Sequence, residues 1–182
     1  MNPLTQFKKI RILSLLIAPA LVFLAALTAL PASAAPPLTC GLTITSLTAP
    51  YLGQFADIEA FAKIDEWRAR LMTEGVSDLH VVQVTIQPGG WLGWHSHPGL
   101  SFVVVKSGTA SFYEADDPTC TPRVIPAGAT LFEPADDVHM VRNESTTEPL
   151  VNVVIQLVPH GAPRAIGEPD PGCFQLTCPY GQ

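Results

Sequence analysis

The chain has 182 residues, a length typical of one domain. Its formal net charge at pH 7 is −6, with 16 acidic residues against 10 lysines and arginines. An acidic chain offers no basic surface on which phosphates could be held, so this balance argues against nucleic acid as a partner.

The first 34 residues have the pattern of a secretory signal peptide. Residues 1–11 carry three positive charges and no acid, residues 12–30 are almost wholly apolar, and residues 31–34 offer a small-residue cleavage site. Cleavage removes three positive charges and no negative ones, which moves the formal charge from −6 to −9. An uncleaved membrane anchor is the alternative, because the apolar run approaches the ~20 residues that span a bilayer, but Pro19 within the run favours cleavage. We therefore expect a secreted or periplasmic protein that is free of the membrane after cleavage.

All the cysteines follow the predicted cleavage site. They are Cys40, Cys120, Cys173 and Cys178. An even number of cysteines in an exported chain indicates two disulfides, for which three pairings exist, and we favour Cys120 with Cys173. Each bridge between a chain end and the body would contribute roughly 2–4 kcal/mol of stability. A cysteine-ligated metal is the alternative, and it is disfavoured because an oxidising compartment competes for the thiols.

Residues 35–75 are predicted to be a lead-in to the fold. The stretch 35–54 is rich in Thr, Pro and Ala and indicates irregular structure. Within 55–72 the apolar residues fit helical spacing at first and strand alternation later. We predict a strand over 66–73, at the edge of the sheet, followed by a turn at 74–75.

Residues 76–160 have the pattern of an all-β core. The clearest strand covers 79–87, where apolar residues occupy alternate positions, and the Pro-Gly-Gly sequence at 88–90 is expected to end it. Further strands are predicted over 94–97, 102–106, 109–114, 130–133, 138–143 and 150–158. Short strands separated by Gly, Pro and Asp turns are typical of a β-sandwich or barrel. The proline-rich residues 161–182 are predicted to be a coil tail.

Two histidines separated by one residue lie in the middle of this core. If 94–97 is a strand, side chains repeat every second residue, so His95 and His97 leave the backbone on the same face. Two converging imidazoles are half of a metal site.

The spacing around these histidines resembles the first motif of the cupin family, G(X)5HXH(X)3-4E(X)6G. Gly89, His95, His97 and Gly108 occupy its fixed positions, while Ser101 stands where the family has a ligand glutamate.

A second stretch resembles the other cupin motif, G(X)5PXG(X)2H(X)3N. Gly128, Pro134, His139 and Asn143 match it, and Asp136 stands at the position of its glycine. Aspartate tolerates a left-handed backbone better than most residues, so this departure is mild. The resemblance implies an all-β, single-domain cupin barrel, the double-stranded β-helix or jelly roll, with one small-ligand cavity.

The resemblance also implies a metal site. His95, His97 and His139 would hold one divalent transition metal, namely Fe, Mn, Zn, Ni or Cu. Ser101 is a poor ligand, so the fourth position would be open and the metal would keep its full +2 charge; a degenerate site that has lost its metal is the alternative. Glu133 is the nearest acid of the second motif, and we interpret it as a solvated surface residue because it precedes the turn at Pro134.

Three further residues are candidates for the pocket beside the metal. They are Ser101, Trp94 and Phe102, of which Phe102 also suits simple packing. The expected function is that of an exported metalloenzyme acting on a small molecule, of dioxygenase or isomerase type. A non-catalytic module that binds a small ligand and a degenerate cupin with an empty pocket are the alternatives. Because many cupins are dimers, a homodimer is a further expectation from the resemblance.

Overall fold

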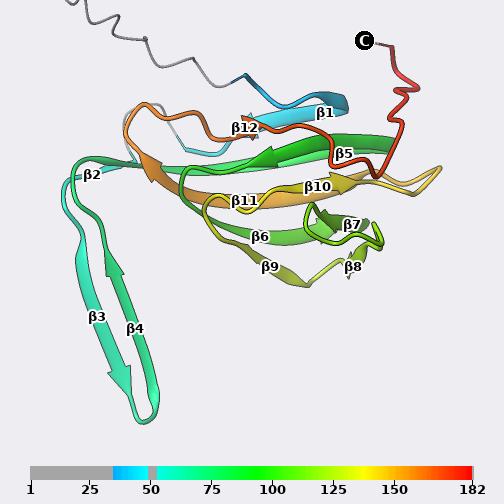
Figure 1. Cartoon of the computed structure of the whole chain (residues 1–182). Coiled ribbons are helices and arrows are strands. Elements are labelled where there is room, and N and C mark those ends of the chain that lie inside the picture. The colour runs from blue at the N-terminus through cyan, green and yellow to red at the C-terminus, as the bar shows by residue number, and fades with distance from the viewer. Residues whose placement is uncertain (1–34, 49–52, 182) are drawn as a thin grey trace, which may run out of the picture. The chain divides into compact units, whose positions relative to one another are not determined.

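The structure is a computed structural model that describes residues 35–48 and 53–181 (Figure 1). The predicted signal peptide, residues 1–34, lies outside the described residues. The described strands are β1 (Thr39–Ser46), β2 (Gln54–Phe55), β3 (Glu59–Ile64), β4 (Trp67–Met72), β5 (Ser77–Ser96), β6 (Leu100–Ser107), β7 (Thr109–Glu114), β8 (Arg123–Pro126), β9 (Thr130–Glu133), β10 (His139–Arg142), β11 (Leu150–Pro159) and β12 (Ile166–Gly167). None of the described residues belongs to an apolar helix of membrane-spanning length.

One sheet of 10 strands curls into a nearly closed antiparallel barrel. Its hydrogen-bonded order is β8-β7-β10-β5-β11-β6-β9, and β1, β2 and β12 pair with β5 in addition. Figure 1 shows the long strands β5 and β11 side by side, with β6 next to β11. The prediction of an all-β barrel is therefore confirmed.

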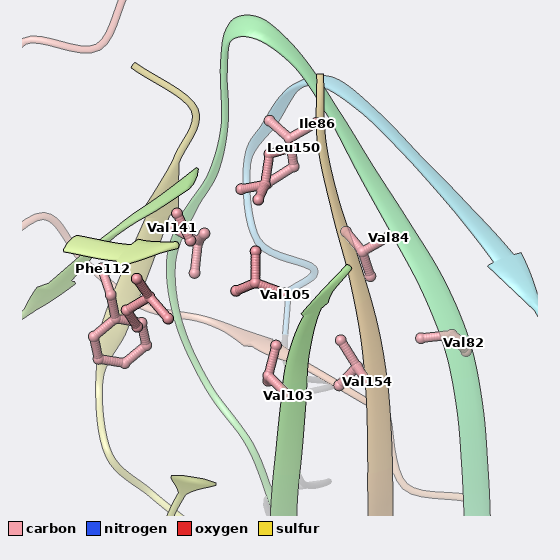
Figure 2. Packing of buried hydrophobic residues seen from close by; sticks show 11 residues of the cluster. Val82, Val84, Ile86, Val103, Val105, Phe112, Val141, Leu150 and Val154 are labelled. Atoms are coloured by element: carbon pink, nitrogen blue, oxygen red, sulfur yellow. The ribbon is translucent and has the colours of Figure 1, made fainter. Parts of the chain in front are cut away.

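The aliphatic core lies between the long strands. Side chains on a strand point alternately to its two faces, and β-branched residues favour extended backbone, so every second residue of β5, β6 and β11 faces the interior. Figure 2 shows this packing, which includes Val82, Val84, Ile86, Val103, Val105, Leu150 and Val154. Burying such a side chain contributes roughly 1.5–3 kcal/mol, so this cluster is a main source of stability.

The expectation that the Pro-Gly-Gly sequence at 88–90 ends a strand is wrong. β5 continues through it for 20 residues in all. Gly89 has a positive φ of 71°, which glycine adopts without strain. The Gly89 N–H donates to the Asn143 carbonyl and the Asn143 N–H donates to the Gly90 carbonyl, both at 2.9 Å, so hydrogen bonding is kept. β5 pairs with β11 before this point and with β10 after it.

The segment before the barrel is more regular than predicted. β1 lies in the stretch expected to be irregular, and it pairs with β5. The predicted strand at 66–73 forms as β4, but it is not an edge strand of the barrel, because it pairs with β3 in a separate two-stranded sheet. The sequence also predicts neither β8 nor β12, and β12 lies in the supposed coil tail. Strands this short depend on their partners, which periodicity does not reveal.

The prediction of two disulfides is confirmed. One joins Cys40 in β1 to Cys178 in the tail. The other joins Cys120, in the loop between β7 and β8, to Cys173, which is the pair that the sequence analysis favours. Both bridges therefore fasten the C-terminal tail to the barrel.

Candidate metal centre

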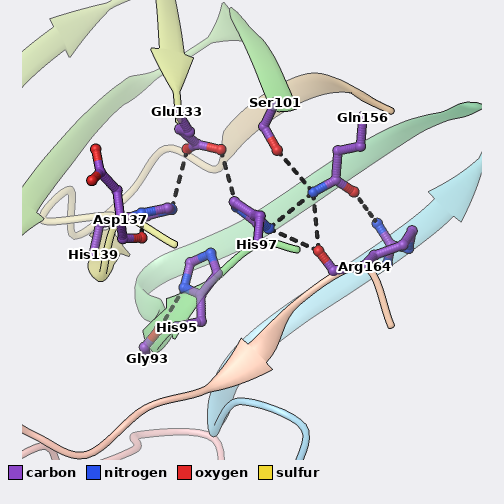
Figure 3. Close-up of polar contacts among 9 residues, drawn as sticks. All are labelled: Gly93, His95, His97, Ser101, Glu133, Asp137, His139, Gln156 and Arg164. Atoms are coloured by element: carbon purple, nitrogen blue, oxygen red, sulfur yellow. Dashed lines mark hydrogen bonds and ion pairs between the residues drawn. The ribbon is translucent and has the colours of Figure 1, made fainter. Parts of the chain in front are cut away.

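Three histidines come together inside the barrel (Figure 3). His95 lies near the end of β5, His97 directly follows that strand, and His139 begins β10 as the cross-strand partner of His95. One ring nitrogen of each lies within 4.8 Å of the others, and each residue is at most 4% exposed. The change of partner along β5 makes this possible, because its second half, which carries the first two histidines, pairs with the strand that carries the third.

A backbone carbonyl lies beside the Nδ1 atom of each ring. The Nδ1 atoms lie 2.8 Å from the Gly93 oxygen for His95, 2.7 Å from the Arg164 oxygen for His97 and 3.0 Å from the Asp137 oxygen for His139. A carbonyl only accepts, so the Nδ1 atoms of His95 and His139 carry the proton and their Nε2 atoms keep the lone pair. His97 Nδ1 lies in addition 3.0 Å from the Gln156 amide nitrogen. This is how proteins orient histidines that bind a metal.

The environment also keeps two of the rings neutral. Burial, together with the neighbouring His139 and His97, lowers the pKa of His95 to about 3. Burial, with the nearby His97, likewise lowers the pKa of His139 to about 3. Both rings are therefore uncharged at pH 7, which is the form that binds metals.

Glu133 is a site residue, and its interpretation as a surface acid is wrong. Its side chain is 4% exposed. One carboxylate oxygen lies 3.1 Å from His97 Nε2 and the other lies 3.4 Å from His139 Nε2. Glu133 on β9 is also the cross-strand partner of Ser101 on β6. A carboxylate thus enters the site from the strand next to the one on which the family motif has its glutamate.

Glu133 contacts two of the three histidines, while the donor atoms that all lie within 4.8 Å of one another among the described residues are those of the histidines. The Nε2 atoms of His97 and His139 are buried and make no hydrogen bond within the described residues. The lone pair of an imidazole nitrogen and a carboxylate oxygen repel each other unless a positive charge lies between them. Two ligands that share an ion at about 2.1 Å, with bond angles of 90–109°, are roughly 3.0–3.4 Å apart. The two contacts of Glu133 have this separation.

The remaining predicted pocket residues behave differently from one another. Ser101 is fully buried, and its hydroxyl accepts a hydrogen bond of 3.1 Å from the Gln156 amide. Phe102 is 52% exposed and packs on Phe132 outside the barrel, so its prediction as a pocket residue is wrong. Trp94 is buried in a separate cluster with Tyr113 and Met140, so its prediction is wrong too. Strand alternation explains both errors, because each aromatic residue directly adjoins an inward-facing residue and must point outward.

A cavity of about 560 Å³ adjoins the histidines. Aliphatic side chains form most of its wall, and its polar lining residues include His95, His97, Glu133, Asn152, Gln156 and Arg164. A more polar cavity of about 470 Å³ is lined by His139 and again by Glu133. Volumes of this size suit small molecules. Glu133 therefore borders the metal centre and both cavities.

Comparison with known proteins agrees with this fold. Residues 82–156, which include both motifs, match the family model of the cupin domain. The barrel is a cupin domain. Among solved structures, the polyketide cyclase RemF from Streptomyces resistomycificus is similar, with 14% identity over 75% of this chain and 79% of that chain and a TM-score of 0.52. A cupin-like protein from Thermotoga maritima matches with 22% identity over 68% and 73% of the two chains and a TM-score of 0.48.

These similarities concern the fold of the cupin domain. A search of curated proteins found no match to the chain. The chemistry of this cupin must therefore be argued from its own residues.

Proposed function

We propose that this cupin binds one divalent transition metal through His95, His97, His139 and Glu133, and uses it on a small molecule in the adjoining cavity. The convergence of a buried carboxylate on two imidazole lone pairs carries the proposal. It revises the expectation of an open fourth position, because Glu133 supplies the negative charge that Ser101 lacks. The centre then has a charge of +1 in place of +2.

The reaction class follows from the ligands and the cavity. A bound metal of this kind polarises an oxygen of the substrate or activates dioxygen. Glu133 is the sole acid among the described residues that line the aliphatic cavity, so it is also the group that can accept a proton from a substrate there. These features support a metal-dependent enzyme of dioxygenase or isomerase type. The mainly aliphatic wall also suits a non-catalytic module that captures a small ligand, which is the second candidate.

We also infer that the protein is exported. The two disulfides suggest an oxidising environment, and the signal-peptide pattern of residues 1–34 supports the same conclusion. N-terminal sequencing of the protein recovered from the periplasm or medium is expected to begin near residue 35. A chain that stays in the cytoplasm with its first residues intact contradicts this inference.

Elemental analysis of protein purified without chelators tests the metal site. Wild type and the exposed-acid control Glu59→Gln are expected to carry about one metal ion per chain. The double variant His95→Ala, His97→Ala is expected to carry none, and Glu133→Gln to bind the metal roughly 10–100-fold more weakly. A Glu133→Gln variant with wild-type affinity would show that the carboxylate is not a ligand.

Turnover separates the two candidate functions. Metal-loaded protein is screened for oxygen uptake and for isomerisation with thiols, flavonols and diketones. Turnover that disappears in the double histidine variant supports the enzyme. Tight ligand binding without turnover supports the binding module.

A further inference from the structure

The aliphatic cavity contains polar groups that the metal centre does not use. Asn152 lies on the inner face of β11, between Leu150 and Val154, and is 5% exposed. Its Oδ1 atom is buried and makes no hydrogen bond within the described residues. A buried acceptor without a partner costs about 1–3 kcal/mol, so a native protein rarely keeps one without a reason. Asn152 is one of the residues that line the cavity, where a ligand could supply the missing donor.

Arg164 provides a positive charge in the same cavity. Its guanidinium is partly buried and lies 3.5 Å from the Gln156 side-chain oxygen. No acid among residues 35–48 and 53–181 forms an ion pair with it. Burial lowers the pKa of Arg164, which shows that its charge is poorly solvated. An unpaired guanidinium in such a place attracts a carboxylate, with which it forms strong hydrogen bonds.

The two polar groups lie at separate points along an apolar wall. Gln156, which contacts Arg164, is four residues from Asn152 on β11, and this is about 14 Å of strand at ~3.4 Å per residue. The wall between and around them is formed by aliphatic side chains, among them Leu42, Val84, Ile86, Val103, Leu131 and Val154. A molecule that satisfies this cavity therefore has an anionic end, an aliphatic middle and a hydrogen-bond donor at its other end.

We propose that the cavity binds a hydroxylated aliphatic carboxylate, with the carboxylate on Arg164 and the hydroxyl donating to Asn152 Oδ1. The proposal rests on the proposed function, because it makes this ligand class the substrate class of the metal centre. The carboxylate end then lies beside Gln156, whose side chain touches Ser101 and the Arg164 carbonyl that orients His97.

Calorimetric titration of the metal-loaded protein tests the ligand class. The probes are 8-hydroxyoctanoate, octanoate and 1,8-octanediol. We expect 8-hydroxyoctanoate to bind roughly 3- to 10-fold more tightly than octanoate, which is the value of one hydrogen bond. We expect the uncharged diol to bind at least tenfold more weakly than 8-hydroxyoctanoate. Equal affinities for the acid and the diol, or no binding of any probe, would overturn the proposal.

Two variants assign the contacts. Asn152→Leu is expected to remove the advantage of 8-hydroxyoctanoate over octanoate, while Arg164→Gln is expected to weaken both acids and leave the diol unchanged. Arg123→Gln, which changes an exposed arginine outside this cavity, serves as the control. Unchanged affinities in both cavity variants would contradict the assignment. Should Arg164→Gln fail to fold, Arg164→Lys, which keeps the charge, is expected to keep the preference for acids over the diol.

Metal content measured on the same samples separates this inference from the proposed function. Protein that holds its metal and binds no probe overturns the ligand class alone. Protein that binds 8-hydroxyoctanoate as predicted and holds no metal overturns the metal centre and leaves the ligand class standing.

Discussion

The two halves of β5 bury their side chains in different ways. Over residues 82–86, buried positions alternate with partly exposed ones, and Val84 and Ile86 line an aliphatic cavity. Over residues 90–96, every residue except Leu92 is buried. There the histidines occupy one face, while Trp94 on the other face packs beneath residues of the tail. The half that carries the histidines, which we call the metal half, is thus supported from behind, and the other half, which we call the cavity half, leaves internal space for a ligand.

The largest expected effect is a loss of folding stability at acid pH, which we attribute to the histidines of the metal half. The pKa values of His95 and His139 are about 3 in the folded chain, against about 6.5 in an unfolded one. Between these values the unfolded chain binds more protons, so stability is full above pH 6.5 and is lost as the pH falls towards 3. For metal-free protein we expect a loss on the order of several kcal/mol, measured by urea unfolding at a series of pH values.

A double variant tests the origin of the acid effect. Replacing both His95 and His139 by alanine is expected to flatten the pH dependence. An equally steep dependence in the double variant would assign the acid sensitivity to other groups.

Truncating one buried side chain in each half gives a direct comparison of their packing. Trp94→Ala removes the support behind the histidines and is expected to cost about 3–5 kcal/mol of unfolding free energy. Ile86→Val removes one methyl group from the cavity half and is expected to cost about 0.5–1.5 kcal/mol. Chemical denaturation of both variants checks the order, and a smaller loss for Trp94→Ala would mean that the two halves do not differ in this way.

Releasing the tail is expected to weaken the metal half selectively. The double variant Cys120→Ser, Cys173→Ser opens the bridge that holds the tail near Trp94 and is expected to cost about 2–5 kcal/mol of stability. Metal titration should show weaker binding as well, because the support of the histidines becomes mobile. The affinity for octanoate, which binds in the cavity half, is expected to change less than the affinity for the metal. A larger change in the octanoate affinity would contradict the difference between the two halves.

The smallest expected effect is a gain in the folding stability of the ligand-free Asn152→Leu variant. Asn152→Leu replaces a buried, unpartnered amide in the cavity half by an aliphatic side chain of similar size, so we expect the ligand-free protein to become about 1 kcal/mol more stable. Thermal unfolding measures this change. A loss of stability would show that Asn152 has a structural partner, such as a bound water, in the ligand-free protein.

The sequence predicts the barrel and the histidine triplet because both depend on local spacing. Alternation marks the long strands, and the spacing of the motifs identifies His95, His97 and His139 before any pairing is known. Asp136 has a positive φ of 64°, as its place in the motif predicts. The role of Asn143 is also readable from the motif, since its side-chain amide donates to the Ile86 and Glu148 carbonyls.

What the sequence misses depends on pairing between strands. Glu133 reaches the site because β9 lies beside β6, and no pattern within 130–133 states which strand is its neighbour. Alternation does carry a partial signal, since Leu131 lines the cavity and Glu133, two residues on, must share its face. The same rule places Trp94 and Phe102 away from the histidines, so applying it residue by residue corrects three of the sequence-based interpretations.

The segment that begins near Arg164 takes part in the histidine site, because the Arg164 carbonyl accepts a hydrogen bond from His97 Nδ1. A proteolytic nick just before Arg164 would leave the C-terminal fragment attached to the barrel through both disulfides. Digestion alone is therefore expected to leave metal binding intact, whereas digestion followed by reduction of the bridges is expected to weaken it by releasing the carbonyl that orients His97.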